Sequence, residues 1–234
     1  MAKQPRITVL QPGPDASLGR FDAWLRDAGV RVGVLGLWEK DVPQLASAGE
    51  GLLVLGGPMS VDDDRAHPWL NALRDLLADA LDIQLPILAI CLGHQVLAQA
   101  LGGRVVVDDP AGGERGVVAI DWTASALNDP VFGALASSGP TLVNQSHHDV
   151  VADLPPGANE LARSATYPNQ VFRLGSAWGV QFHPEKTPQM LARYVADTPD
   201  ERLRLISELT QADDQIRPAG HLVASGFARF VREN

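Results

Sequence analysis

Cys91 is the only cysteine of the 234-residue chain, and its neighbours suit it to act as a nucleophile. It ends an apolar, strand-like run, and Gly93 follows where a helix-like segment begins. Strand, nucleophile and helix in this order make a nucleophile elbow, here with Ala89 in place of the first glycine of the motif. The N-terminus of a helix at this point favours the thiolate over the thiol. The alternative is a cysteine that only packs in the core, as most free cysteines do.

A thiolate that attacks a carbonyl group needs a proton carrier, and the segment GVQFHPE at 179–185 offers one. His183 ends a strand-like run, and Glu185 follows two residues later. A carboxylate at this spacing can bind the far ring nitrogen, which fixes the tautomer and stabilises the imidazolium. The alternative is a surface loop in which these residues have no role.

The segment LGGPMS at 55–60 follows a third strand-like run and is a candidate oxyanion hole. Glycines at the carboxyl end of a strand allow backbone N–H groups to turn toward a ligand. The segment lacks the Gly-Lys-Ser/Thr of a phosphate-binding loop. We therefore expect the N–H groups of Gly57 and Leu92 to face the developing oxyanion, with a tight turn of no chemical role as the alternative.

The remaining histidines suggest weaker roles. His67 and His221 lie in helix-like segments and are expected to be structural, whereas His94, close to Cys91, is expected to line the pocket. His147 and His148 invite a metal site together with His183. Adjacent side chains on a strand point apart, and no further ligands stand at usable spacing, so we expect no metal.

The elements that must position these residues alternate between strand and helix in the first half of the chain. Strands are predicted at 7–11, 31–38, 51–57 and 86–91, and helices at 17–29, 67–82 and 94–103. Continuous apolar strands between helices indicate a mostly parallel sheet that is covered on both faces. The sequence therefore predicts an α/β fold.

The pattern changes after residue 103. Short strands are predicted at 104–109, 116–122, 140–146, 159–166, 170–175 and 177–183, and they indicate an antiparallel or mixed extension. Three helices are predicted at 187–197, 200–216 and 218–231, with their leucines and aromatic residues facing the core. No linker or repeat interrupts the chain. We expect one domain over 1–234, with a catalytic core at about 6–190 and a helical tail at about 190–234.

Composition restricts the partners and the compartment. The net charge of −9 and the scattered basic residues argue against a nucleic-acid surface. No apolar run reaches the roughly 18 residues that a membrane span needs, and the start of the chain lacks the pattern of a signal peptide. One cysteine cannot form an internal disulfide. These features together predict a cytoplasmic protein without a membrane segment.

The motifs ICLGHQ, GGPMS and GVQFHPE, in this spacing, resemble those of the class I glutamine amidotransferases. The chain looks most like stand-alone members related to the glutaminase domain of GMP synthetase, over about residues 6–190. The resemblance implies a flavodoxin-like three-layer sandwich and a triad of Cys91, His183 and Glu185. Cys91 would form a γ-glutamyl thioester, and Gly57 and Leu92 would bind the oxyanion.

The resemblance also implies how the substrate is held. Gln95 matches a family residue that holds the amino-acid end of glutamine. Ser146 and His147 fall where family members contact that end, and Gly56 is a further candidate for a substrate contact. No cofactor is implied.

The resemblance leaves three functions open. Ala89 departs from the usual glycine of the elbow, and no nucleotide-binding loop for activating an ammonia acceptor is found. The first interpretation is a glutaminase that supplies ammonia to a separate synthetase subunit. The second is a γ-glutamyl hydrolase that acts on γ-glutamyl peptides or amines. The third is a non-catalytic binding or regulatory module with the same fold.

Overall fold

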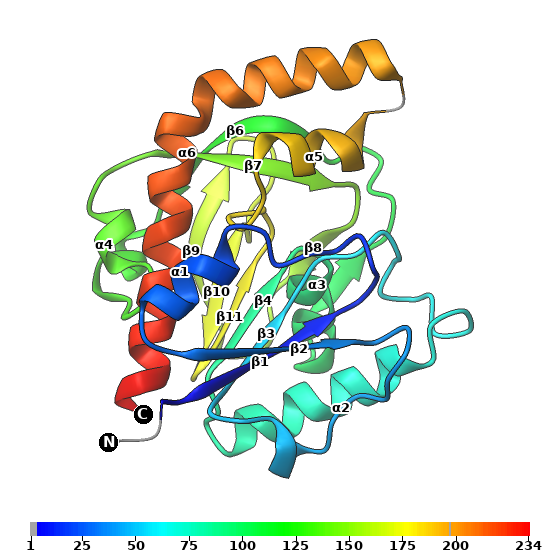
Figure 1. The fold of residues 1–234 in the computed structure, drawn as a ribbon, viewed down its shortest axis with the longest axis vertical. Helices are drawn as coiled ribbons and strands as arrows, with labels where there is room; N and C mark the ends of the chain where they lie inside the picture. The colour runs from blue at the N-terminus through cyan, green and yellow to red at the C-terminus, as the bar shows by residue number, and fades with distance from the viewer. Residues whose placement is uncertain (1–3, 197) are drawn as a thin grey trace.

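The computed structural model describes residues 4–196 and 198–234, and its main element is a nine-stranded sheet in the order β2-β1-β3-β4-β11-β10-β9-β6-β7 (Figure 1). These strands are Arg6–Gln11 (β1), Arg31–Gly36 (β2), Gly51–Val54 (β3), Ile87–Ile90 (β4), Glu114–Trp122 (β6), Thr141–His147 (β7), Asn159–Ser164 (β9), Val171–Leu174 (β10) and Ala177–Val180 (β11). Two further strands, Arg104–Val106 (β5) and Val150–Asp153 (β8), form a separate two-stranded sheet.

Five strands of the large sheet are parallel, in the order β2-β1-β3-β4-β11. This is the flavodoxin-like order, so the predicted fold class is confirmed. The other four strands continue the sheet as an antiparallel extension. The segment 177–183 was expected in the extension, and its strand β11 in fact joins the two parts, antiparallel to β10 and parallel to β4. The sequence did not predict β8.

Alternate residues of the parallel strands point to opposite faces of the sheet, and each face has its own core. In β4, Leu88 and Ile90 pack on the side of α1 (Phe21–Asp27) and α6 (Pro199–Glu233). Ile87 and Ala89 pack on the side of α2 (Trp69–Asp82) and α3 (Leu92–Ala100). Shorter helices complete the fold at Leu45–Ser47 (η1), Ala124–Asn128 (η2), Gly133–Ala136 (α4) and Pro188–Val195 (α5). The predicted three layers are therefore present.

The C-terminal region differs from the prediction. The two helices expected at 200–216 and 218–231 are one helix, α6, and Pro218 lies inside it. Proline has no N–H and its ring crowds the preceding turn, which bends a helix without always ending it. Figure 1 shows α6 changing direction along its length. No helix of the described residues is long and apolar enough to cross a membrane.

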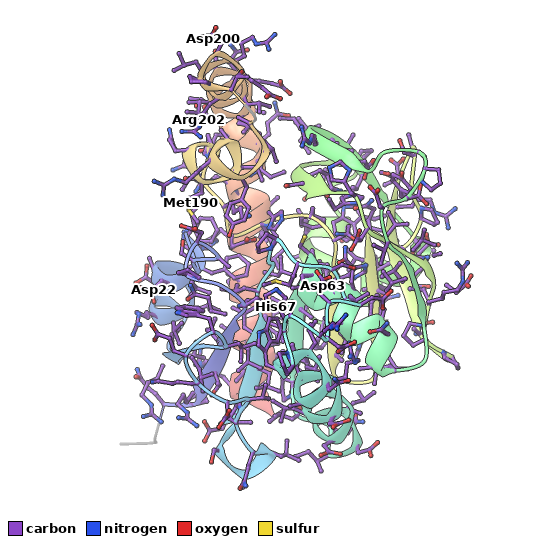
Figure 2. All side chains as sticks on the ribbon, turned by 90° about the vertical axis from the view of Figure 1, so that its right-hand side faces the viewer. Asp22, Asp63, His67, Met190, Asp200 and Arg202 are labelled. Carbon is purple, nitrogen blue, oxygen red and sulfur yellow. The ribbon has the colours of Figure 1, made fainter. Side chains whose placement is uncertain are left out.

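The two halves of α6 are used differently. Residues from Ile216 to Val231 are regularly buried, and most belong to the core on the α1 side, as predicted for this segment. In the N-terminal half, Leu209 is buried beside α5, whereas the side chain of Leu203 is 67% exposed. Asp200 and Arg202 lie at one extreme of the molecule (Figure 2).

We predict that Phe227→Ala lowers the free energy of unfolding by about 3–5 kcal/mol, because the Phe227 ring is fully buried in this core. Leu203→Ala, in the exposed part of the same helix, should change it by no more than about 0.5 kcal/mol. Urea unfolding followed by circular dichroism measures both values. Equal losses in the two variants would contradict an integral role for the C-terminal half of α6.

Candidate active site

Cys91 lies at the turn between β4 and α3 in a strained backbone conformation. Its φ and ψ angles are 53° and −109°, and a positive φ is uncommon for a residue other than glycine. Its N–H donates to the carbonyl oxygen of Val180 at 2.7 Å, which ties the turn to β11. Such strain is stable only where the surroundings impose it, and it occurs most often at functional sites.

Ala89, where the elbow departs from the family pattern, fits without distortion. Its methyl group is fully buried in the core on the α2 and α3 side, and its register neighbours are Val54 and Gly179. The tight position is Gly93, where a Cβ atom would lie 2.7 Å from the carbonyl oxygen of Val54. The turn therefore needs its second glycine more than its first.

His183 and Glu185 follow β11 and lie beside Cys91. His183 Nδ1 is 2.8 Å from Glu185 Oε1, and both side chains are buried. The backbone N–H of His183 donates to the carbonyl oxygen of Asn144 at 2.8 Å. A Cβ atom on Gly56 would lie 2.9 Å from His183 Cε1 and 3.1 Å from Cys91 Cβ. Gly56 is therefore small because it faces both residues at once.

The backbone of Glu185 is fixed by elements from both ends of the chain. Its carbonyl oxygen accepts from the N–H of Arg20 at 2.9 Å. The Arg20 guanidinium donates to both carboxylate oxygens of Asp213 in α6, each at 2.8 Å. A bidentate pair of this kind is directional and partly shielded from water. The loop that carries the candidate base is therefore braced by α6.

The charges around His183 favour its imidazolium form. Burial of the ring lowers the pKa of His183, and so does the Lys186 ammonium, but the Glu185 carboxylate and the Cys91 sulfur outweigh them and raise it to about 9. Burial raises the pKa of Glu185, yet His183 and Lys186 hold it below its usual range. The arrangement stores a proton on His183 next to Cys91, where a leaving group would need it.

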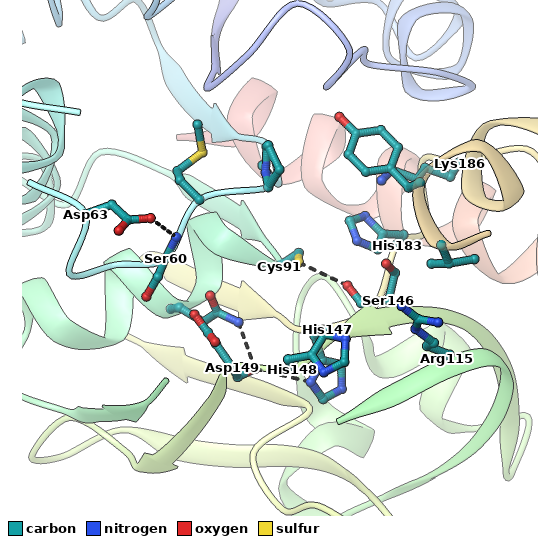
Figure 3. Close-up of a pocket in the computed structure, with 16 residues that line it drawn as sticks. Ser60, Asp63, Cys91, Arg115, Ser146, His147, His148, Asp149, His183 and Lys186 are labelled. Carbon is teal, nitrogen blue, oxygen red and sulfur yellow. Dashed lines mark hydrogen bonds between the residues drawn. The ribbon is translucent and has the colours of Figure 1, made fainter. Parts of the chain in front are cut away.

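A pocket of about 400 Å³ opens over Cys91 (Figure 3). The predicted residues Gly57, Gln95, Ser146, His147 and His183 line it with Cys91. Sequence reasoning missed other parts of its wall, including Arg115, Asp149, Lys186 and Tyr194. Lys186 directly follows the His-Pro-Glu motif and Asp149 directly follows the two histidines, so proximity to a motif was the available signal.

His94 does not line the pocket, contrary to the sequence expectation. Its ring is fully buried and packs on Phe172, with ring centroids 5.1 Å apart. Burial lowers the pKa of His94 to about 3, so the ring is neutral. One position further along α3, Gln95 does reach the pocket, and its Nε2 donates to the Asp149 carbonyl oxygen at 2.9 Å.

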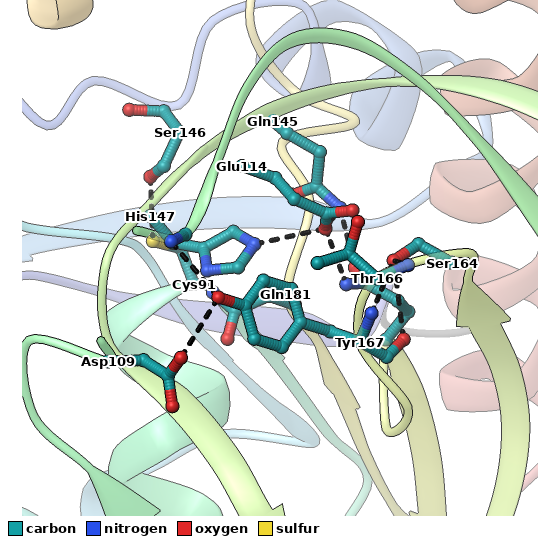
Figure 4. Close-up of polar contacts among 12 residues, drawn as sticks. Cys91, Asp109, Glu114, Gln145, Ser146, His147, Ser164, Thr166, Tyr167 and Gln181 are labelled. Carbon is teal, nitrogen blue, oxygen red and sulfur yellow. Dashed lines mark hydrogen bonds and ion pairs between the residues drawn. The ribbon is translucent and has the colours of Figure 1, made fainter. Parts of the chain in front are cut away.

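Ser146 and His147 lie on β7 beside the sulfur. Cys91 Sγ is 3.7 Å from the carbonyl oxygen of Ser146. His147 has a protein partner at each ring nitrogen: Glu114 Oε2 at 3.3 Å and the Asp149 carbonyl oxygen at 3.2 Å (Figure 4). The same Glu114 oxygen accepts from Gln145 and Gln170. The His147 ring is thus held from both sides and shapes the wall of the pocket.

Gly57 and Leu92 lie next to each other, as an oxyanion hole requires. Gly57 lines the pocket, and a Cβ atom on it would lie 3.1 Å from Leu92 Cδ2. Leu92 is the first residue of α3, so its N–H has no partner within the helix. Among the described residues, no group of three or more His, Cys, Asp or Glu side chains is placed to hold a metal ion.

Comparisons with known proteins point to one family. The family model described as glutamine amidotransferase class-I matches residues 22–198. The glutamine-hydrolyzing GMP synthase of Pyrobaculum aerophilum is 29% identical over 192 residues, which are 82% of this chain and 35% of that protein. The chain therefore spans about a third of the length of this relative.

Two further matches cover more of their partners. A separate subunit of the glutamine-hydrolyzing GMP synthase of Haloarcula marismortui is 36% identical over 165 residues, which are 69% of this chain and 76% of that subunit. The crystal structure of a glutamine amidotransferase from Thermotoga maritima matches with a TM-score of 0.84 at 25% identity. That match covers 98% of this chain and 99% of the other, so it includes the helical C-terminal region.

The buried pair of His183 and Glu185 predicts a stability that depends on pH. The pKa of His183 is about 9 in the folded state and about 6.5 in an unfolded chain, so its stabilising contribution is complete below pH 6.5 and is lost as the pH rises through 9. In Glu185→Gln the carboxylate is absent, and the loss between these pH values should be smaller. Urea unfolding across the range measures it.

Glu39→Gln is the matched control, because Glu39 is exposed and far from this loop in sequence. It should keep the pH dependence of the wild type. If Glu185→Gln also kept it, the carboxylate would not be what stabilises the His183 imidazolium.

Proposed function

The chain belongs to the class I glutamine amidotransferases, and on that premise we propose that it hydrolyses the side-chain amide of glutamine through a γ-glutamyl thioester on Cys91. The observation that carries the proposal is the strained Cys91 backbone beside a buried His183 that is bound to Glu185. A nucleophile, a base and a third group that orients the base are the parts that covalent acyl transfer needs.

In the first half of the reaction, the Cys91 thiolate attacks the γ-carbonyl carbon and the C=O electron pair moves onto oxygen. The backbone N–H groups of Gly57 and Leu92 stabilise this oxyanion. The C–N bond then breaks as the carbonyl re-forms, and the leaving nitrogen takes the proton of His183. The products of this half are ammonia and the γ-glutamyl thioester.

In the second half, His183 is neutral and takes a proton from a water molecule that attacks the thioester carbonyl. The C–S bond breaks as the second oxyanion collapses, which releases glutamate and returns the thiolate. Glu185 keeps His183 Nδ1 protonated in both halves, so that Nε2 exchanges the proton. Glu185 is therefore a positioning residue.

Two uses of this chemistry are favoured by different observations. The Haloarcula relative, which is one subunit of a GMP synthase, favours a glutaminase that delivers ammonia to a separate synthetase subunit. A second cavity next to the pocket favours a γ-glutamyl hydrolase acting on peptides or amines. A non-catalytic module is disfavoured, because it would have no use for the strain at Cys91 or for a stored proton beside it.

We predict that Cys91→Ala lowers kcat for glutamine hydrolysis by at least about 1,000-fold, because no acyl-enzyme can form. Glutamate release in a coupled dehydrogenase assay measures the rate, and circular dichroism checks the fold. Ser138→Ala, on an exposed loop, is the control and should keep the wild-type rate. Full activity in Cys91→Ala would refute the thioester.

If the chain is a glutaminase subunit, its glutamine hydrolysis should rise severalfold when the synthetase subunit of the same host is added with its nucleotide substrates. The reason is that a partner can order the site and remove ammonia. The rate of glutamate release with and without the partner measures this. An unchanged rate at saturating partner, together with fast turnover of γ-glutamyl peptides, would favour the hydrolase instead.

A further inference from the structure

We propose that the cavity next to the catalytic pocket is a subsite for the leaving group, and that it takes γ-glutamyl amides whose nitrogen belongs to an amino acid or a short peptide with a free carboxylate. The inference rests on the proposed thioester chemistry. It extends that chemistry from glutamine, whose leaving group is ammonia, to donors with a larger, anionic leaving group.

The position of His183 decides on which side of Cys91 the leaving group departs. The general acid must touch the leaving nitrogen, so the leaving group lies on the His183 side of the sulfur. Lys186 lies on this side too (Figure 3). Gln95, the expected contact of the amino-acid end, is held with Asp149 in another part of the pocket wall. The donor therefore points its amide nitrogen toward Lys186.

The space on the leaving-group side is larger than ammonia needs. A second cavity of about 480 Å³ is lined by Gly13, Pro14, Asp15, Pro58, Arg193 and Tyr194. It shares Pro58 and Tyr194 with the catalytic pocket of about 400 Å³. Pockets of about 300–1,000 Å³ bind ligands of drug size. Together the two cavities offer room for a dipeptide or tripeptide, well beyond free glutamine.

Lys186 brings a positive charge to the junction of the cavities. Its side chain is 4% exposed, lines the pocket, and places Nζ 3.6 Å from the ring centroid of Tyr194. Burial lowers the pKa of Lys186, while Glu185 and Cys91 oppose this shift. An ammonium held over an aromatic face in a mostly desolvated position attracts a carboxylate strongly.

Arg193 and Asp15 give the outer cavity groups of both signs. Arg193 precedes Tyr194 in α5 and presents an exposed guanidinium, which can bind a carboxylate with two parallel hydrogen bonds. Asp15, from the loop after β1, can accept from a backbone N–H of a peptide. A cation and an anion across one cavity fit the alternating N–H and carboxylate groups of a peptide better than they fit an apolar amine.

The reaction with such a donor balances as it does with glutamine. The Cys91 thiolate bonds to the γ-carbonyl carbon, the C–N bond breaks, and the amine nitrogen of the leaving amino acid takes the proton of His183. Water then cleaves the thioester, and the products are glutamate and the free amino acid or peptide. No further reactant is needed.

The test compares kcat/KM for three donors: γ-glutamyl-alanine, its C-terminal amide, and glutamine. The wild type should hydrolyse the free acid roughly tenfold better than the amide, because only the acid carries the carboxylate. Arg193→Gln and Lys186→Met should each reduce this ratio of acid to amide at least threefold. Arg202→Gln, at an exposed position in α6, is the matched control and should leave the ratio unchanged.

The outcomes separate the subsite from the chemistry. Hydrolysis of glutamine without hydrolysis of γ-glutamyl-alanine would overturn the subsite and leave the thioester mechanism standing. Equal rates for acid and amide, or a ratio that both cavity variants leave unchanged, would overturn carboxylate recognition. If none of the three donors were hydrolysed, the proposed function itself would fail, and the subsite with it. Arg193 is exposed, so its variant keeps the test valid if Lys186→Met does not fold.

Discussion

The parallel pairing of β4 with β11 is the constraint on which the site depends. It sets Ile90 opposite Val180, so the residues that follow the two strands emerge at the same edge of the sheet. Cys91 and His183, 92 positions apart in the sequence, meet there. The hydrogen bond from the Cys91 N–H to the Val180 carbonyl oxygen extends the pairing by one residue into the strained turn. Strand pairing, rather than the loops, thus holds nucleophile and base in register.

The second constraint is that charges buried at this edge must be balanced. A single ionised group in such a place costs several kcal/mol, so each needs a partner. Glu185, His183 and Lys186 are each almost fully buried and influence one another's pKa. The bracing of the Glu185 backbone by Arg20, and of Arg20 by Asp213, keeps these groups in place. The C-terminal helix therefore contributes to the site although it carries no motif.

Much of this could be predicted from the sequence, because the chemistry lies in short segments whose local structure is strongly determined. The elbow around Cys91 and the pair His183 and Glu185 are examples. Other features depend on contacts between distant segments. The Lys186–Tyr194 contact depends on the packing of α5, and the unbroken α6 depends on core contacts that stabilise a helix around Pro218. His94 was misjudged because one helical position decides whether a side chain faces the pocket or Phe172.

The measurement that tests the account most directly is the mass of the intact enzyme after a rapid acid quench during turnover of glutamine or γ-glutamyl-alanine. The account predicts a population heavier by one γ-glutamyl group, and peptide mapping should place the adduct on Cys91. The adduct should disappear in Cys91→Ala and be released by hydroxylamine, as a thioester is. Continued release of glutamate with no adduct on Cys91 at any quench time would contradict the thioester mechanism.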